Sequence, residues 1–144
     1  MKYFIVEPEV AGGLGPSSII EPGTHPPIIH KLEYRFEGWL GSHIIESFPI
    51  CLASDVLLRE LRAQELTGFT EDNVTVTFSE EFQPSASTQK MPSFKWLKIV
   101  GQMNKDDFFL ADDQRLVISE NAKMIIESIG GVNWGIEVST VHKK

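Results

Sequence analysis

The chain has 144 residues, of which 42% are hydrophobic and 23% are charged, a composition typical of one globular domain (residues 1–144) and not of a disordered or collagen-like chain. Its 13 basic and 20 acidic residues give a formal net charge of −7, so the surface repels phosphate and no nucleic-acid partner is expected. No apolar run approaches the roughly 20 residues that span a bilayer, and Glu7 and Pro8 come before any signal-peptide apolar segment, so we expect a cytoplasmic protein that does not bind membranes.

The first half of the chain predicts strands, a long loop and one capped helix. Residues 3–6 are rich in β-branched and aromatic side chains, which predicts a strand. The glycines and prolines of residues 8–27 predict a long surface loop that lacks regular structure over most of its length. Apolar and charged residues alternate over residues 28–36, which predicts one half-buried strand. Ser54 then precedes leucines at helical spacing, which predicts a helix over residues 55–65 with Ser54 as its N-cap.

The middle of the chain predicts two strands separated by a polar loop. Residues 74–78 alternate valine or phenylalanine with threonine, which is the clearest strand pattern in the sequence. Residues 83–93 are polar and predict a loop, and residues 94–99 predict the next strand. Residues 105–113 carry several aspartates and are predicted to be an acidic connection.

The last part of the chain predicts a second capped helix between two strands. Residues 116–118 predict a strand, and Ser119 is the expected N-cap of a helix over residues 120–129. Residues 136–141 predict a final strand. The order of these elements indicates the α+β class, with a mostly antiparallel sheet and two main helices packed on it.

Two parts of the sequence share one order of elements. Residues 50–78 predict a strand, a serine-capped helix, a glycine stop and a strand, and residues 116–138 predict the same series. Sequence identity between the two is low, so a true repeat and a coincidence both remain open.

Few residues of the chain suggest catalysis. The Gly12-Gly13-Leu14-Gly15 stretch lacks the Gly-Lys-Ser/Thr ending of a phosphate loop. The four histidines (His25, His30, His43 and His142) have no metal-ligand spacing, and we expect neither a metal nor a cofactor. Cys51 is the only cysteine, so no intrachain disulfide can form, and its apolar neighbours favour a buried structural role over a nucleophile.

Four carboxylates lie close together in the sequence, at Asp106, Asp107, Asp112 and Asp113. Such carboxylates can form a solvated turn, bind a divalent cation, or present negative charge to a basic partner. Trp39 lies between glycines in a predicted turn, where it either packs against its own domain or contacts a partner. We take the four aspartates, with Trp39 and Phe108 as exposed aromatic anchors, as the candidate partner-binding residues.

Several short motifs occur together in an order that resembles one known family. The motifs are Glu7-Pro8-Glu9-Val10, Gly12-Gly13-Leu14-Gly15, His25-Pro26-Pro27-Ile28, Phe36-Glu37-Gly38-Trp39-Leu40-Gly41, Glu46-Ser47-Phe48-Pro49, Leu66-Thr67-Gly68-Phe69, Val74-Thr75-Val76, Phe94-Lys95-Trp96-Leu97-Lys98-Ile99, Lys105-Asp106-Asp107-Phe108 and Leu116-Val117-Ile118-Ser119-Glu120. Between about residues 3 and 129 the chain resembles the bacterial polymorphic-toxin immunity proteins, in the family first catalogued as a domain of unknown function and later numbered as the eleventh immunity family.

This resemblance implies a non-catalytic cytoplasmic protein that binds and neutralises a cognate secreted toxin in the producing cell. The acidic balance adds the expectation that the toxin has a basic surface. The alternatives are an enzyme that acts on a small molecule through Cys51, a histidine or the Asp106–Asp113 carboxylates, and a regulatory module without a toxin partner. A deep apolar pocket with converging polar groups and perturbed ionisable residues would favour the enzyme.

Overall fold

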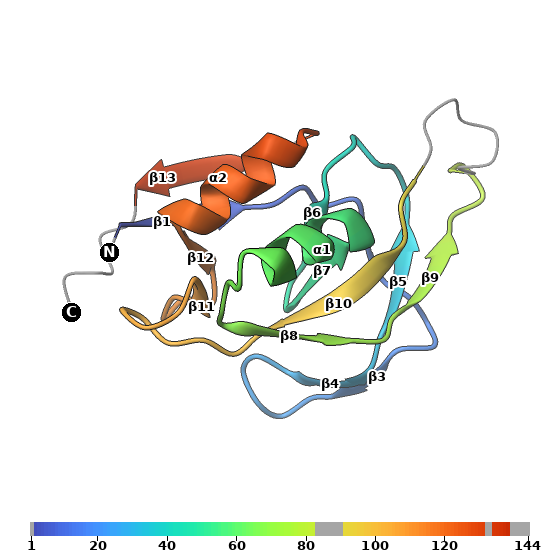
Figure 1. Ribbon diagram of the computed structural model, residues 1–144. Coiled ribbons are helices and arrows are strands. Elements are labelled where there is room, and N and C mark those ends of the chain that lie inside the picture. Colours follow the sequence, from blue (N-terminus) through green and yellow to red (C-terminus); the bar gives the residue numbers. More distant parts are fainter. Residues whose placement is uncertain (1, 83–90, 132–133, 139–144) are drawn as a thin grey trace.

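The structure is a computed structural model that describes residues 2–82, 91–131 and 134–138 (Figure 1). The first strands are β1 (Tyr3–Glu7), β2 (Gly12–Leu14), β3 (Ile19–Glu21), β4 (Ile28–Lys31), β5 (Glu33–Phe36), β6 (Ile44–Ser47) and β7 (Ile50–Ser54). After helix α1 (Asp55–Ala63) come β8 (Phe69–Asp72), β9 (Thr75–Phe78), β10 (Phe94–Ile99), β11 (Phe108–Leu110), β12 (Leu116–Ser119), helix α2 (Glu120–Ile129) and β13 (Gly135–Val138).

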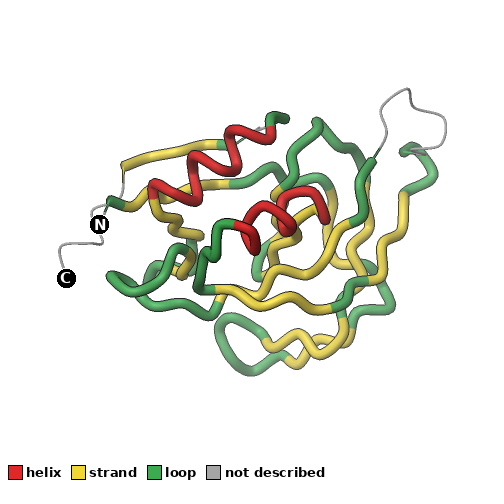
Figure 2. Tube along the Cα trace, in the orientation of Figure 1, coloured by secondary structure: helices red, strands yellow, loops and turns green. Residues whose placement is uncertain are grey.

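Strand pairing confirms the predicted α+β class. Two four-stranded sheets have the orders β11-β12-β1-β13 and β6-β7-β10-β8, and a smaller sheet has the order β2-β5-β9. Strands β3 and β4 form a separate two-stranded hairpin. Among the described strand pairs, only β5 and β9 run parallel, so the sheets are mostly antiparallel as expected. Figure 2 shows the two helices lying side by side over these sheets.

The β6-β7-β10-β8 sheet separates two hydrophobic cores. On one face, Cys51 and Ala53 of β7 pack with the helices and with the β11-β12-β1-β13 sheet. On the other face, Ile50 and Leu52 of β7 pack with the aromatic side chains of the β2-β5-β9 sheet. Because both faces of β7 are covered, all five of its residues are buried, which explains why its sequence is nearly continuous in apolar residues.

Both predicted helices and both predicted N-caps are confirmed. The Ser54 side-chain oxygen accepts a hydrogen bond from the Leu57 N–H, and the Ser119 oxygen accepts one from the Ala122 N–H. Helix α1 buries Leu57, Leu58 and Leu61, and α2 buries Ala122 and Ile126. Helix α1 ends at Ala63, before the predicted residue 65, and Glu65 has a left-handed backbone with φ 57°, a conformation that does not continue a helix.

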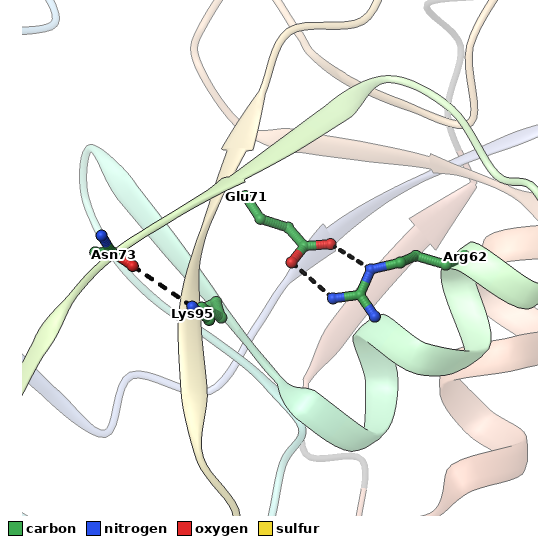
Figure 3. Close-up of polar contacts among 4 residues, drawn as sticks. All are labelled: Arg62, Glu71, Asn73 and Lys95. Atoms are coloured by element: carbon green, nitrogen blue, oxygen red, sulfur yellow. Dashed lines mark hydrogen bonds and ion pairs between the residues drawn. The ribbon is translucent and has the colours of Figure 1, made fainter.

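A polar contact joins the end of α1 to strand β8 (Figure 3). The Arg62 guanidinium donates two hydrogen bonds of 2.7 Å to the Glu71 carboxylate, from Nε and Nη2. This bidentate pairing lowers the pKa of Glu71, because the guanidinium stabilises the ionised carboxyl. On the same surface Lys95 lies 3.5 Å from the Asn73 side-chain oxygen. The pairs hold the edge strand β8 against its neighbours.

The two parts of the sequence with the same predicted order also share one topology. In each, a hairpin is followed along the chain by a capped helix and then a strand. In the sheet, a strand from elsewhere in the chain lies between the hairpin and that last strand, antiparallel to both of its neighbours. The orders β6-β7-β10-β8 and β11-β12-β1-β13 therefore correspond position by position, with β10 and β1 as the inserted strands. A repeated topology is therefore present in the described chain, but the strand that corresponds to β13 is β8; the predicted strand over residues 74–78 is β9, which belongs to another sheet.

Equivalent hydrogen bonds at the helix starts extend this correspondence. The Asp55 N–H donates to the carbonyl of Ser93, just before β10, and the Glu120 N–H donates to that of Lys2, just before β1. The Ser54 N–H donates to the carbonyl of His43, and the Ser119 N–H donates to that of Asp107. His43 and Asp107 are thus equivalent, and the side chain of each lies 2.7 Å from the hydroxyl of its N-cap serine.

Three of the predictions about loops and strands need correction. The loop over residues 8–27 contains strands β2 and β3. These strands are stabilised by hydrogen bonds to β5 and β4, although glycines and prolines are frequent in this part of the sequence. Residues 28–36 form two strands and not one. The acidic connection over residues 105–113 contains strand β11, which pairs with β12. Of the polar loop 83–93, residues 83–90 lie outside the described residues, as do residues 139–141 of the final strand.

The buried carboxylate of Glu33 ties residues 15–18 to β9. It accepts hydrogen bonds of 2.7 Å from the Ser17 N–H, the Ser17 hydroxyl and the Thr77 hydroxyl. These bonds, of which that from Thr77 has the largest effect, lower the pKa of Glu33, since they stabilise the charged form.

In the described part of the chain, no helix is long and apolar enough to cross a membrane.

Removing either N-cap serine is expected to destabilise the protein. Replacing Ser54 or Ser119 by alanine leaves the donor of Leu57 or Ala122 without its acceptor, at a cost of about 1 kcal/mol each. Urea denaturation followed by far-ultraviolet circular dichroism measures the change. The exposed Ser93→Ala variant is the matched control, and an unchanged midpoint in both cap variants would contradict the capping role.

Lowering the pH is expected to reduce the unfolding free energy of the protein through protonation of Glu33. Because the folded-state pKa of Glu33 lies below its ordinary value of 4.5, its contribution is complete above that value and is lost as the pH falls through the folded pKa. Glu33→Gln should lose roughly 1–3 kcal/mol of unfolding free energy near neutral pH and show a smaller loss of stability in acid. The exposed Glu37→Gln variant is the control, and equal acid sensitivity of wild type and Glu33→Gln would refute the assignment.

Candidate functional site

An apolar hollow of about 690 Å³ lies where the two related units meet. The β6–β7 hairpin and strand β10 of one unit supply much of its lining, and residues 110–116 of the β11–β12 hairpin contribute from the other unit. The described residues that line it are Ile28, Glu46, Phe48, Pro49, Ile50, Cys51, Thr70, Trp96, Leu97, Lys98, Ile99, Val100, Leu110, Gln114 and Leu116. Its volume falls within the roughly 300–1,000 Å³ that is typical of ligand pockets.

Glu46 places a carboxyl group in this apolar lining. Burial, with a smaller contribution from the negative charge of Glu7, raises the pKa of Glu46 to about 7, because both disfavour the ionised form. Outside the sheet ladder, its backbone N–H donates to the carbonyl of Glu9 and its carbonyl accepts from the Tyr34 hydroxyl. Its carboxylate forms no hydrogen bond with any other described residue. Near neutral pH this group is therefore close to half ionised and has an unused hydrogen-bonding capacity.

Cys51 lies opposite Glu46 across the β6–β7 pair, and it too lines the hollow. Burial raises the pKa of the Cys51 thiol, and the charge of Glu46 adds to the increase. The neutral thiol is a weak nucleophile, because the thiolate is the reactive form. This environment supports the structural role expected from the sequence.

Lys98 is the other charged residue in the lining, and its charge is already paired. Its ammonium lies 3.0 Å from an Asp72 carboxylate oxygen and 4.4 Å from the centre of the Trp96 ring. The ring face and the carboxylate both attract the ammonium, so Lys98 is held along the wall of the hollow.

Four exposed apolar side chains surround the hollow, and we call them the apolar rim. Ile28 is 43% exposed, Phe48 53%, Val100 62% and Leu110 39%. They come from β4, the β6–β7 turn, the end of β10 and β11. A single exposed apolar residue is ordinary, but several around one concavity are typical of a binding surface.

The predicted aspartates divide into two groups. Asp112 and Asp113 are exposed in the turn between β11 and β12, whose ends Leu110 and Gln114 line the hollow. Asp113 pairs with Arg115, with 2.8 Å between Oδ2 and Nε. The two aspartates therefore place two negative charges beside the rim, and Arg115 offsets that of Asp113.

Asp106 and Asp107 are bonded within the protein itself. The Asp106 carboxylate accepts the Gln102 N–H at 2.8 Å. The Asp107 carboxylate accepts from the Thr67 N–H at 2.9 Å and from the Ser119 hydroxyl at 2.7 Å. Asp107 therefore connects the segment after α1 to the N-cap of α2, a structural role that the sequence analysis did not assign.

The proposed aromatic anchors differ from expectation. Phe108 is completely buried in the core, so the expectation that it is exposed is wrong; strand β11 carries it inward against Phe69. Trp39 is half-buried, donates from its indole nitrogen to the Ser42 carbonyl at 2.8 Å, and packs edge-on against Phe94. These contacts favour the interpretation that Trp39 packs against its own domain.

The described histidines lie apart in different environments. The His43 Nδ1 atom lies 2.7 Å from the Ser54 hydroxyl oxygen, and burial lowers the pKa of His43, because it disfavours the charged ring. His30 pairs with Glu21, and His25 packs against Phe48 of the rim. Within residues 2–82, 91–131 and 134–138, no three or more metal-ligating side chains are grouped as a cation site. His142 lies outside the described residues.

Sequence reasoning missed the hollow and its central carboxyl. Glu46, Phe48 and Val100 have no catalytic spacing, and only the fold brings them together. The available signal was weak: Glu46 follows two apolar residues on a short strand over residues 44–47. No protein-family model matches the chain, and no curated protein matches it either.

Replacing Cys51 by alanine is expected to lower the unfolding free energy by roughly 1 kcal/mol and to leave binding intact, because the buried thiol fills space and is held neutral. Urea denaturation measures the change in unfolding free energy, and a binding assay with the partner measures whether binding is kept. In the wild type, a thiol reagent should react rapidly only after unfolding. A Cys51→Ala protein that folds normally and loses activity would restore the nucleophile hypothesis.

Proposed function

We propose that this protein is a non-catalytic immunity protein that binds a secreted toxin and neutralises it inside the producing cell. The ordered motifs that resemble the eleventh immunity family suggest the role. The observation that carries a binding function is the apolar rim around the hollow, where Ile28, Phe48, Val100 and Leu110 are each at least 39% exposed.

The charge of the chain supports a basic partner. The formal net charge is −7, and Asp112 and Asp113 lie in the turn beside the hollow. Opposite charge around a hydrophobic contact speeds association and fixes orientation, while the desolvated apolar centre supplies most of the affinity. We therefore assign the contact to the rim and the steering to the β11–β12 turn.

The first experiment tests the role in cells. Each gene that flanks the coding sequence is expressed with and without this protein, and one whose product stops growth is the candidate toxin. Growth should be rescued, and the purified pair should form a stable complex with one-to-one stoichiometry in size-exclusion chromatography. Rescue without a complex would contradict neutralisation by occupancy and would favour an enzymatic antidote.

The second experiment tests whether the apolar rim forms the interface. Val100→Ser removes an apolar contact and should weaken the complex about tenfold or more, mainly through faster dissociation. Met124→Ser is the matched control, because Met124 on α2 is also 62% exposed and does not line the hollow. Surface plasmon resonance measures the affinity and dissociation rate of both variants. Equal effects of the two substitutions would show that the rim is not part of the interface.

The electrostatic assignment has its own variant. Asp112→Asn should slow association and weaken its dependence on salt, with little change in dissociation. The earlier candidate Asp107 is unsuitable for this test, because its substitution would disturb the N-cap of α2.

One observation favours the second candidate, an enzyme or binding protein for a small molecule. The hollow is apolar, has the size of a ligand site, and contains Glu46, whose pKa is raised to about 7; such a carboxyl can exchange a proton at neutral pH. Loss of rescue in a Glu46→Gln protein that still binds the toxin would support this candidate over occupancy.

A further inference from the structure

We propose that the hollow binds an aliphatic chain that ends in a positively charged nitrogen, with the Glu46 carboxylate as its counter-ion. We further propose, on the basis of the immunity role, that the toxin supplies this group as a lysine or arginine side chain inserted between the rim residues.

The lining of the hollow selects an aliphatic chain. Most of its residues are apolar, including Ile50, Leu97 and Leu116. The stems of lysine and arginine bury well along such surfaces while the charged end seeks a polar partner. A polar ligand without an aliphatic part would leave these walls in contact with water or with unpaired polar groups.

The Glu46 carboxylate selects a cation. It is partly buried and has no hydrogen bond from another described residue. A bound ammonium or guanidinium would supply the missing donors as charge-assisted hydrogen bonds. A neutral ligand would desolvate the carboxylate without pairing it, and an anion would be repelled by it.

The neighbouring charges do not compensate Glu46. Glu7, near the end of β1, adds negative charge. Lys98, from β10, is bonded to Asp72 and lies over Trp96. Cys51, from β7, is held as a neutral thiol. The site therefore has one uncompensated negative group inside an apolar wall.

The test uses three six-carbon probes of similar shape: n-hexylammonium, 1-hexanol and hexanoate. Each is titrated into the purified protein at about pH 8, roughly one unit above the pKa of about 7, where Glu46 is mostly ionised. Backbone amide shifts of Thr70, Lys98 and Val100 in nuclear magnetic resonance spectra report occupancy of the hollow. Hexylammonium should bind at least tenfold more tightly than hexanol, and hexanoate should bind most weakly.

The decisive variant is Glu46→Gln, which keeps the shape of the side chain and removes its charge. It should abolish the preference for hexylammonium over hexanol. Glu80→Gln is the control, because it removes the same charge from an exposed position outside the hollow, and it should keep the preference. Equal binding of the three probes by the wild type, binding of none, or an unchanged preference in Glu46→Gln would overturn the proposal.

A competition experiment identifies the source of the cation. Hexylammonium should weaken the complex with the toxin in the wild type and have no such effect in Glu46→Gln. A toxin complex that is insensitive to bound hexylammonium would overturn the assignment to a toxin side chain and leave a free amine as the ligand. Failure of any toxin complex to form would instead refute the immunity role, and the selectivity of the hollow for the ammonium probe would still be decided by the first titration.

Discussion

The burial of strand β7 on both faces is the constraint on which the rest of the structure depends. Because Ile50 and Leu52 face one core while Cys51 and Ala53 face the other, the β6-β7-β10-β8 sheet must be covered on both sides. Helices α1 and α2 cover it together with one sheet, and the β2-β5-β9 sheet covers the other face. The hollow occurs at the hairpin ends, where this coverage stops and apolar residues such as Phe48 and Val100 remain exposed.

The repeated unit shows how one local arrangement can be stabilised by different side chains. In both units the oxygen of the N-cap serine accepts a helix N–H, and its hydroxyl is also hydrogen-bonded to the side chain of the residue before the hairpin. That side chain is an imidazole at His43 and a carboxylate at Asp107. A hydroxyl can both donate and accept, so side chains of different chemistry can bond to the N-cap serine at this position. At this position the two units therefore share a contact without sharing a residue type.

The sequence predicted the features that depend on neighbours in the chain. Both helices and both caps were correct because a serine before apolar residues at helical spacing is a local signal. Strands β2, β3, β6, β8 and β11 were missed, since short strands become stable only through pairing with other strands. Phe108 was misplaced for the same reason: pairing of β11 with β12 turns it into the core. The hollow was invisible because its residues come from separate elements, and exposed apolar residues carry no motif.

A comparison of the partly buried carboxylates distinguishes structural from functional roles. Glu9 accepts hydrogen bonds from the N–H groups of Leu40 and Ser42, and Glu33 accepts three from Ser17 and Thr77. Each bonded carboxylate holds a loop in place, so the fold itself explains its presence. Glu46 has no such bonds, yet it resides in an apolar wall where an uncompensated charge opposes folding. The hydrogen bonds of the described residues therefore give Glu46 no structural role comparable to those of Glu9 and Glu33, and this contrast is the basis for proposing a cationic ligand in the hollow.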